Sequence, residues 1–289
     1  MRATWKFLWT HPLLKGRPLY AFGRFFFWQL RSRLWKHPVV FAWVGGSKLW
    51  IRGGWSSLTG NYYAGLYDFE DMGFLLHFLR PGDIFADVGA NMGSYSILAS
   101  GVCRARSVSY EPVPAAFGRL LANRDLNDLS ALVDCRACAV GAAPGVISMT
   151  SALDATNHVV SDDDPDRMKV QVVALDEDLP ETPILMKIDV EGFESEVLGG
   201  ARRLLGDPRL KAIVIELNGS GRRYGRNDAD IHALLLAAGF KAYHYSPQGR
   251  SLTPLARPGA ANTLYCRDLM LVEERLRTAA AFTAAGRSF

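Results

Sequence analysis

The sequence predicts an α/β fold with a doubly wound, mostly parallel sheet. Strand-like apolar runs alternate with helix-like runs from residue 84 onward, and such alternation is typical of parallel sheets with helices on both faces. The first of these strands ends in a glycine turn, where sheets of this kind bind ligands. The 289 residues are 49% apolar and 21% charged, an ordinary globular composition that suits one large domain.

The elements follow from the spacing of apolar residues and from the positions of Gly and Pro. Strands are expected at 47–52, 84–88, 107–110, 133–140, 146–150, 170–174, 184–188 and 213–217. Helices are expected at 68–79, 94–100, 115–123, 194–205 and 231–238. Residues 68–270 would form the main domain, preceded by an extension over 1–67 and followed by a terminal helix over 271–289.

The extension over 1–67 differs in charge from the rest of the chain. It holds ten Lys or Arg and no Asp or Glu, whereas the remainder holds 23 basic and 29 acidic residues, and all seven Trp lie between Trp5 and Trp55. A helix is expected at 19–36, where arginines alternate with Phe and Trp. This pattern fits either peripheral contact of residues 1–55 with an anionic membrane or a helix packed on the body with solvated arginines.

The cysteines and apolar runs bear on metal binding and location. Cys135 and Cys138 form a CxxC, but no second pair accompanies them, so no metal site is expected. Few cysteines indicate a reducing compartment. No secretory signal and no run of about 18 apolar residues is evident, so a cytoplasmic location is expected, with the membrane periphery as the alternative.

The segment from Asp87 to Gly93 (DVGANMG) follows the first predicted core strand. Gly89 and Gly93 can adopt conformations closed to other residues. The pattern lacks the G-x-G-x-x-G of dinucleotide sites, which weighs against an NAD-dependent oxidoreductase. An acid at the start of the turn suits a ligand with an amino group and a sulfonium. Glu111 ends the next strand, where an acid can bind both ribose hydroxyls, so a nucleoside site is predicted.

Further motifs extend this pattern. Tyr110-Glu-Pro112, then MKIDVEGFE over 186–194, VLGG over 197–200, IEL over 215–217 and NTLY over 262–265 accompany the glycine turn. Together they resemble the FkbM-type methyltransferases over roughly residues 68–268. The resemblance implies a Rossmann-like class I methyltransferase fold and S-adenosyl-L-methionine as the cofactor. It also implies O-methylation of a hydroxyl on a saccharide, glycolipid or other small hydroxylated metabolite.

The resemblance also implies roles by position. The methionine part of the cofactor would contact Asp87, Gly89, Ala90, Asn91 and Gly93, with Glu70 facing the same end; Glu111 and Pro112 would contact the ribose, Cys138 and Ala139 within 137–140 the adenine, and Asp189 the methyl group.

Three residues are candidates for the catalytic base that an alcohol acceptor requires. Asp189 and Glu191 alternate after a buried strand and face the same side if the segment stays extended. Asp189 is the first choice, whereas Glu191 could instead cap the following helix. His158 is a candidate because imidazole titrates near neutral pH, although a lone loop histidine is commonly structural. Lys187 could pair with either carboxylate.

The acceptor is expected to be a hydroxylated small molecule or a lipid-linked saccharide. Nucleic acid is a less favoured partner, because the body of the chain is acidic and no motif for base methylation is evident. A non-catalytic lipid-surface module that only binds a nucleoside is the remaining alternative. The sequence leaves the oligomeric state open.

Overall fold

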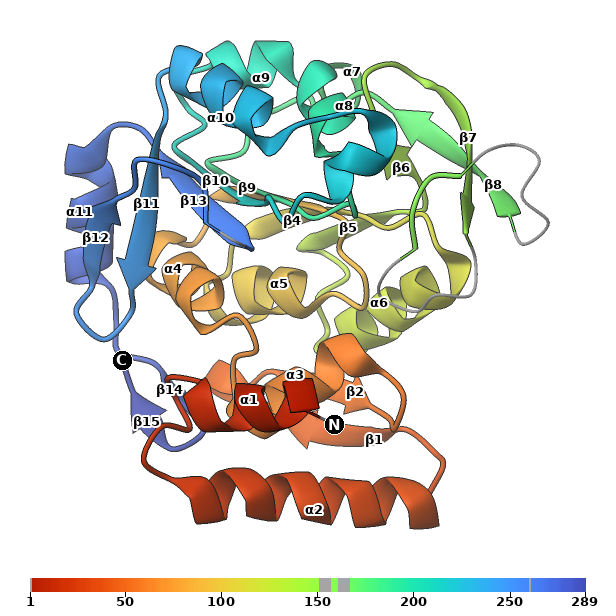
Figure 1. The fold of residues 1–289 in the computed structure, drawn as a ribbon, viewed down its shortest axis with the longest axis vertical. Coiled ribbons are helices and arrows are strands. Elements are labelled where there is room, and N and C mark those ends of the chain that lie inside the picture. Colours follow the sequence, from red (N-terminus) through yellow and green to blue (C-terminus); the bar gives the residue numbers. More distant parts are fainter. Residues whose placement is uncertain (1, 151–156, 161–166, 260) are drawn as a thin grey trace.

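The computed structural model describes residues 2–150, 157–160, 167–259 and 261–289. Its centre is an eight-stranded sheet (Figure 1). The strands in spatial order are β12 (Ser251–Pro254), β11 (Lys241–Ser246), β13 (Asn262–Cys266), β10 (Ala212–Glu216), β9 (Leu185–Ile188), β3 (Ile84–Val88), β4 (Arg106–Tyr110) and β5 (Val133–Arg136).

The prediction of a doubly wound, mostly parallel α/β fold is confirmed. Strands β10, β9, β3, β4 and β5 are parallel neighbours, so their carboxyl ends share one edge of the sheet. Antiparallel pairing links β13 to β10 and to β11, and β12 to β11. Strands β11 and β12 were not predicted from the sequence. They form a short hairpin, and whether such segments become strands depends on the strands beside them more than on their own residue propensities.

Alternating residues of each central strand face two separate apolar cores. Phe85 and Val214 lie in one core, whereas Ala86 and Ile213 lie in the other, as the two-residue period of a strand requires. Helices cover both faces of the sheet (Figure 1). One side carries α4 (Phe69–Phe78), α5 (Ser94–Ile97) and α6 (Pro114–Leu126), and the other carries α7 (Leu175–Asp178), α8 (Glu194–Gly199), α9 (Arg202–Gly206) and α10 (Asp228–Ala237).

A second, three-stranded sheet lies beside β5. It consists of β6 (Ala139–Val140), β8 (Arg167–Val173) and β7 (Gly145–Thr150), in that order. The single strand expected at 133–140 is therefore wrong. Its first half pairs with β4 and its second half pairs with β8, because the chain leaves the large sheet after Arg136, whose guanidinium is held by Asp178.

Two expected helices are also corrected. The helix expected at 194–205 is broken into α8 and α9 at Gly199-Gly200. A Cβ at Gly200 would lie 2.1 Å from the carbonyl oxygen of Gly141, so the backbones meet there. The terminal helix expected at 271–289 is shorter: α11 (Leu269–Thr278) is followed by the hairpin β14 (Thr283–Ala284) and β15 (Arg287–Ser288). Ala285 and Gly286 both have positive φ, which suits a tight hairpin turn.

The first 67 residues form a layer below α4, α5 and α6 (Figure 1). The layer contains α1 (Arg2–Thr10), α2 (Pro18–Leu34), β1 (Val39–Ala42), β2 (Lys48–Ile51) and α3 (Ser56–Ala64). Leu49 and Leu58 share an apolar core with Phe74 and Phe85. In this part of the chain, as in the other described residues, no helix has the length and apolar character needed to span a bilayer.

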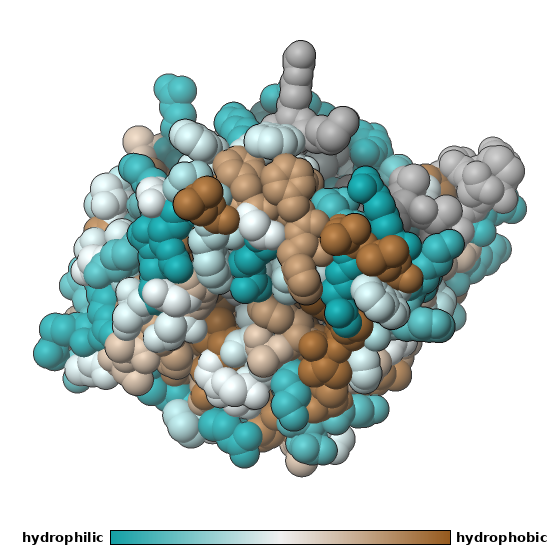
Figure 2. All heavy atoms as spheres, turned by 90° about the horizontal axis from the view of Figure 1, so that it is seen from below, coloured by the Kyte–Doolittle hydropathy of each residue, from teal (hydrophilic) through white to brown (hydrophobic). Residues whose placement is uncertain are grey.

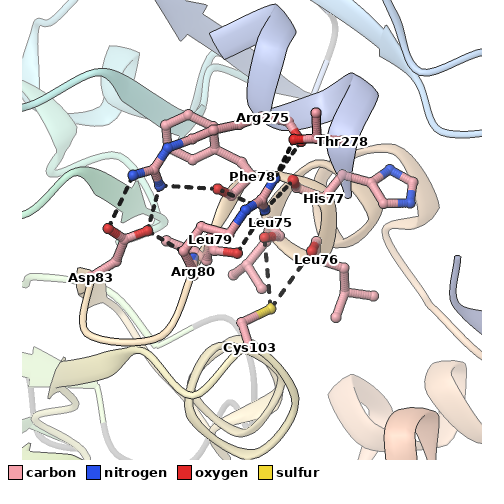
Figure 3. A network of polar contacts seen from close by, with 10 residues as sticks. All are labelled: Leu75, Leu76, His77, Phe78, Leu79, Arg80, Asp83, Cys103, Arg275 and Thr278. Carbon is pink, nitrogen blue, oxygen red and sulfur yellow. Dashed lines mark hydrogen bonds and ion pairs between the residues drawn. The ribbon is translucent and has the colours of Figure 1, made fainter. Parts of the chain in front are cut away.

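A polar network ties α11 to the entry of the first core strand (Figure 3). The guanidinium of Arg275 binds the carboxylate of Asp83, and Arg80 donates to the carbonyl oxygen of Arg275. The backbone N–H of Arg80 also donates to Asp83, at 2.7 Å. Hydrogen bonds to charged groups contribute about 1.5–3 kcal/mol each, so the network holds the start of β3 and thereby the turn at its other end.

Candidate functional site

A cavity of about 270 Å³ opens at the carboxyl ends of β3, β4, β9 and β10. One part of its wall is acidic and is made by Asp68, Glu111, Asp189, Glu191 and Glu216. Among the described residues that line the cavity, Lys187 is the only Lys or Arg. Five carboxylates against one ammonium leave a formal charge of −4 when all are ionised, which favours a positively charged ligand.

Another part of the wall is apolar. It is made by Cys138, Ala139, Val140, Ile147, Met149, Val159 and Phe193. Most of these residues belong to the small sheet or to the link that leads into it. A flat heteroaromatic ring fits such a surface, because apolar and aromatic groups are favoured in mostly apolar pockets. Cys138 and Ala139, which were expected to contact the adenine, are part of this apolar wall.

The turn after β3 has three left-handed residues within five positions. Gly89, Asn91 and Gly93 have φ values of 80°, 50° and 87°. The N–H groups of Gly89 and Ala90 both donate to the carbonyl oxygen of Tyr110, at 3.1 and 2.9 Å. The turn is therefore folded back over the end of β4. Gly89 and Asn91 line the cavity, whereas Ala90 and Gly93, which were also expected to contact the cofactor, are not among its lining residues.

Gly89→Ala is expected to be more damaging than Gly82→Ala. Both glycines have positive φ, at 80° and 86°, so both variants carry the same backbone strain of roughly 1–3 kcal/mol. A Cβ at position 89 would also lie 1.8 Å from the carbonyl oxygen of Asp189, whereas position 82 has open space. Thermal unfolding of both variants measures the difference, and equal melting temperatures would contradict it.

Asp87 and Glu70 do not line the cavity. Asp87 is buried, and its Oδ2 accepts from the N–H and hydroxyl of Ser96, at 3.1 and 2.5 Å. Within the described residues, its Oδ1 has no hydrogen-bond partner. Burial raises the pKa of Asp87. Glu70 is exposed and its carboxylate lies 3.1 Å from His244 Nε2, because it comes two residues after Asp68 and therefore points about 200° further round the helix axis.

Glu111 lies at the end of β4 and is only 5% exposed. Its two carboxylate oxygens accept from the backbone N–H groups of Asn91 and Val113, each at 2.8 Å. Burial raises its pKa to about 7. Each oxygen keeps a second lone pair, so the side chain can accept two further hydrogen bonds from the cavity. Pro112 lines the cavity beside it.

Lys187 and Asp189 form an ion pair at the end of β9. Lys187 Nζ lies 2.9 Å from Asp189 Oδ2 and 4.9 Å from the ring centroid of Tyr95. Although burial disfavours its charge, the carboxylates of Asp189 and Asp87 raise the pKa of Lys187. The lysine thus stays protonated and fixes the Asp189 carboxylate at the cavity wall.

Glu191 reaches the cavity by a turn, not along an extended segment as expected. It has a φ of 56° and is followed by Gly192, with a φ of 106°. It does not cap the next helix. The N-cap position is held by Phe193, with no side-chain cap. Glu194, the first residue of α8, stabilises the turn before the helix, because its Oε1 accepts from the N–H groups of Val190 and Gly192, at 3.2 and 3.0 Å. This function of Glu194 was not predicted.

Asp189, Glu191 and Glu216 form a carboxylate trio at the acidic wall. One oxygen from each lies within 4.8 Å of the others, a spacing that a divalent cation could also bridge. Burial, followed by the charge of Asp189, raises the pKa of Glu191 to about 7 and that of Glu216 to about 8. Glu216 Oε2 has no hydrogen-bond partner in the described chain. The trio therefore contains groups that can exchange a proton near neutral pH.

Two acidic residues of the cavity wall were not proposed from the sequence. Glu216 ends β10 beside Asp189, the residue after β9, so the rule that selected Glu111, an acid at the carboxyl end of a core strand, could have found it. Asp68 accepts from the Tyr95 hydroxyl at 3.0 Å, and burial raises its pKa to about 6. No local pattern marks Asp68, because the packing of α4 brings it to the cavity.

His158 is not among the residues that line the cavity, although its neighbours Asn157 and Val159 are. Its backbone N–H donates to the Thr150 hydroxyl at 3.0 Å, and its carbonyl accepts from the Thr150 N–H at 3.0 Å. The residue therefore pairs the segment 157–160 with β7.

The fold and the cavity define an α/β protein with a ligand-sized cavity at the carboxyl ends of its parallel strands. The profile of the Methyltransferase FkbM domain matches residues 87–242, and the chain belongs to this family of methyltransferases. It is 31% identical over 211 residues to the 31-O-demethyl-FK506 methyltransferase FkbM of Streptomyces tacrolimicus, covering 60% of this chain and 78% of that protein.

Two further similarities were found. The hexuronic acid methyltransferase AglP of Haloferax volcanii is 29% identical over 171 residues, covering 57% of this chain and 66% of that protein. The crystal structure of an FkbM methyltransferase from Methylobacillus flagellatus is 16% identical, with a TM-score of 0.44. That match covers 73% of this chain and about half, 52%, of the solved chain.

Proposed function

We propose that this protein is an S-adenosyl-L-methionine-dependent O-methyltransferase that acts on a hydroxyl of a saccharide or a related hydroxylated metabolite. The observation that carries the proposal is the division of one cavity into an acidic part and an apolar part. The cofactor has the same division, with a cationic sulfonium and ammonium at one end and an adenine at the other. Family membership supports the methyl transfer, and the O-methyltransferase among the relatives supports an oxygen acceptor.

The residues fit the cofactor as follows. Cys138, Ala139 and Val140 would contact the adenine, and Glu111 would accept hydrogen bonds from the ribose hydroxyls. The backbone of Gly89 and Asn91 would contact the methionine part, with Asp68 near its ammonium. Glu216, a residue of the cavity wall, has an Oε2 without a hydrogen-bond partner among the described residues, so the acidic part keeps an acceptor for a ligand.

When bound, the cofactor would supply a methyl group on a sulfonium: the acceptor oxygen would bond to the methyl carbon in line with the breaking carbon–sulfur bond, and S-adenosylhomocysteine would leave. The chain must then orient the acceptor and take its proton. The Lys187 ammonium holds Asp189 in place, so Asp189 would accept a hydrogen bond from the acceptor hydroxyl and orient it. Glu191 or Glu216, with pKa values of about 7 and about 8, would take the proton. Orientation and general-base catalysis together can supply several kcal/mol.

Binding of S-adenosyl-L-methionine should strengthen as the pH rises, relative to binding of the product S-adenosylhomocysteine, which lacks the sulfonium charge. Burial raises the pKa values of Asp68, Glu111, Glu191 and Glu216 to between about 6 and about 8. These groups are protonated and neutral at lower pH, and they become anionic as the pH passes through this window. If the bound cation lowers the pKa of one of these carboxyl groups by one unit, its affinity for the ionised form is about tenfold higher than for the protonated form.

Calorimetric titrations of both ligands across this pH window measure the effect. The ratio of the two dissociation constants should change in favour of S-adenosyl-L-methionine as the pH rises. A ratio that is the same at both ends of the window would show that the acidic wall does not face the cationic part of the cofactor.

The acceptor can be sought with labelled cofactor. The chain would be incubated with methyl-labelled S-adenosyl-L-methionine and a panel that includes 31-O-demethyl-FK506, hexuronic acids and saccharides that contain them. Hexuronic acids are included because one relative is named for them. In addition, the positive charge of Arg223 lies near Glu191, where it partly offsets the rise in the Glu191 pKa, and such a charge would attract the carboxylate of an acidic sugar. Transfer to any hydroxyl, abolished by S-adenosylhomocysteine, supports the proposal. Transfer to carbon or nitrogen alone would refute O-methylation.

A further inference from the structure

We propose that the outer face of α2, together with α1, docks on the surface of an anionic lipid bilayer. The proposal concerns where the protein binds and does not depend on the reaction at the cavity. It starts from the side chains of α2 that point away from the body of the protein. These side chains are apolar, although they face solvent.

Five large apolar side chains of α2 are more than half exposed. They are Leu19 (91%), Phe26 (54%), Phe27 (58%), Leu30 (60%) and Leu34 (63%). Their spacing of three, four and seven residues places them on one side of the helix. The opposite side packs on the body through Ala21 and Trp28, which are buried. The helix is therefore apolar on both sides, and a contiguous apolar surface of this kind marks an interaction site.

The apolar face continues onto neighbouring segments. Trp5 and Trp9 of α1 are 46% and 65% exposed, and Trp35, directly after α2, is 59% exposed. The ring centroid of Trp5 lies 4.8 Å from that of Phe22 and 6.3 Å from that of Phe26, so α1 adjoins α2. Figure 2 shows this side of the molecule, where brown and tan side chains form a band bordered by hydrophilic ones.

The charges around this face select its partner. The first 67 residues carry ten Lys or Arg and no acid, and Lys6, Lys15, Arg33 and Lys36 are exposed. A second copy of the chain would bring the same cations against them, and like charges oppose that contact. Anionic lipid headgroups complement them instead. Tryptophans at the boundary and cations beside an apolar face are the features of helices that lie in a membrane interface.

The body of the protein holds α2 firmly. Arg24 donates to the carbonyl oxygen of Tyr62 through Nε at 2.8 Å, and the rings of Trp28 and Tyr62 lie 4.9 Å apart. Arg17 donates to the carbonyl of Ala285 at 2.6 Å. Tyr62 belongs to α3, which leads directly to Asp68 at the cavity wall. Docking of α2 would thus fix the orientation of the cavity relative to the lipid surface.

Vesicle co-sedimentation of the full chain tests the proposal. The probes are vesicles of phosphatidylcholine alone and vesicles that also contain phosphatidylglycerol. The test variant carries Leu19→Gln, Phe26→Gln and Leu30→Gln. The matched control carries Leu234→Gln, Leu236→Gln and Met270→Gln, which remove three exposed apolar side chains from α10 and α11, on other sides of the molecule. A third variant, Arg33→Glu with Lys36→Glu, reverses charge without removing apolar surface.

We expect the wild type and the control to bind the phosphatidylglycerol vesicles equally. The α2 triple variant should bind at least about tenfold more weakly, because three apolar side chains no longer leave water. The charge reversal should remove the preference for phosphatidylglycerol. Unchanged melting temperatures of the variants would show that they fold, as the exposure of these side chains predicts.

Three results would overturn the proposal. The first is that the wild type does not bind phosphatidylglycerol vesicles. The second is that the α10/α11 control loses as much binding as the α2 triple variant. The third is that the α2 triple variant binds as well as the wild type. Analytical ultracentrifugation tests the alternative that a second copy of the chain covers this face. Self-association that the α2 triple variant abolishes, without vesicle binding by the wild type, would assign the face to a second copy of the chain.

Discussion

Asp189→Asn, Glu191→Gln and Glu216→Gln are each expected to lower the rate of methyl transfer at saturating cofactor by more than they weaken binding of the cationic cofactor, to which the acidic wall also contributes. A general base contributes about 10²–10⁴-fold, so the variant that removes the base should lose that much in kcat. Loss of Asp189 removes the partner of Lys187 and should mainly misplace the acceptor. Initial rates with the acceptor found by the labelled-methyl screen measure these effects.

The pH profile distinguishes a base from a structural carboxylate. A base acts only when it is ionised, so the wild-type kcat/KM should rise as the pH passes through the pKa of Glu191, about 7, or of Glu216, about 8. The variant that lacks the base should lose this rise. Glu196→Gln is the matched control, because Glu196 pairs with Arg226 and does not line the cavity.

The carboxylate trio could instead act through a bound cation, and a chelator separates the two cases. Activity that survives treatment with EDTA, with the pH dependence intact, supports proton transfer by the trio. Activity that EDTA abolishes and Mg²⁺ restores would replace the base with a metal-assisted step. Full activity in all three variants would exclude the trio from the reaction.

Glu111→Gln is expected to weaken binding of S-adenosylhomocysteine by roughly 10–100-fold. In the variant, the two ribose hydroxyls would donate to a neutral amide and no longer to a carboxylate. A hydrogen bond to a charged group is more favourable than one to a neutral group by about 1 kcal/mol or more. The substitution also alters contacts with the N–H groups of Asn91 and Val113. The melting temperature without ligand measures that structural part.

A ligand comparison isolates the contact to the ribose. The wild type should bind 5′-methylthioadenosine more tightly than its 2′,3′-dideoxy analogue, and Glu111→Gln should reduce the difference between the two ligands. A variant that binds both ligands more weakly but by the same factor would show a structural effect alone. Glu181→Gln serves as the control, since that carboxylate is exposed and pairs with Arg106.

The sequence was sufficient for the parts of the site that depend on a strand and the residues directly after it. Gly89, Asn91, Glu111 and Asp189 all follow buried strands, and parallel strands bring their carboxyl ends to one edge. The link at Cys138 and Ala139 was placed at the cavity by family resemblance, although the strand expected there was wrong. The change of sheet after Arg136 depends on partners far away in sequence, so no local pattern could reveal it.

Residues brought to the cavity by packing could not be predicted in the same way. Asp68 precedes a helix that does not belong to the sheet, and its role depends on how α4 lies against Tyr95. The choice of Glu70 from the same region pointed to the correct helix end, but the helical twist directs Glu70 toward His244. Similarly, Glu191 reaches the trio through two residues of positive φ, which the expected extended segment would not contain.

The extension over 1–67 was separated from the body by its charge and its tryptophan content. In the structure it shares an apolar core with α4 and β3, so its buried side chains pack like those of any other layer. The charge asymmetry nevertheless marked the segment that carries the exposed apolar face of α2. Composition therefore located the surface, and only the fold showed which side chains point outward.

The most direct test of the account is a calorimetric titration of the wild-type protein with S-adenosyl-L-methionine and, in parallel, with NAD. We predict one binding site for S-adenosyl-L-methionine and none for NAD, because the acidic wall suits a sulfonium and the turn after β3 lacks the pattern that binds a pyrophosphate. Binding of NAD without binding of S-adenosyl-L-methionine would contradict the assignment of the cavity.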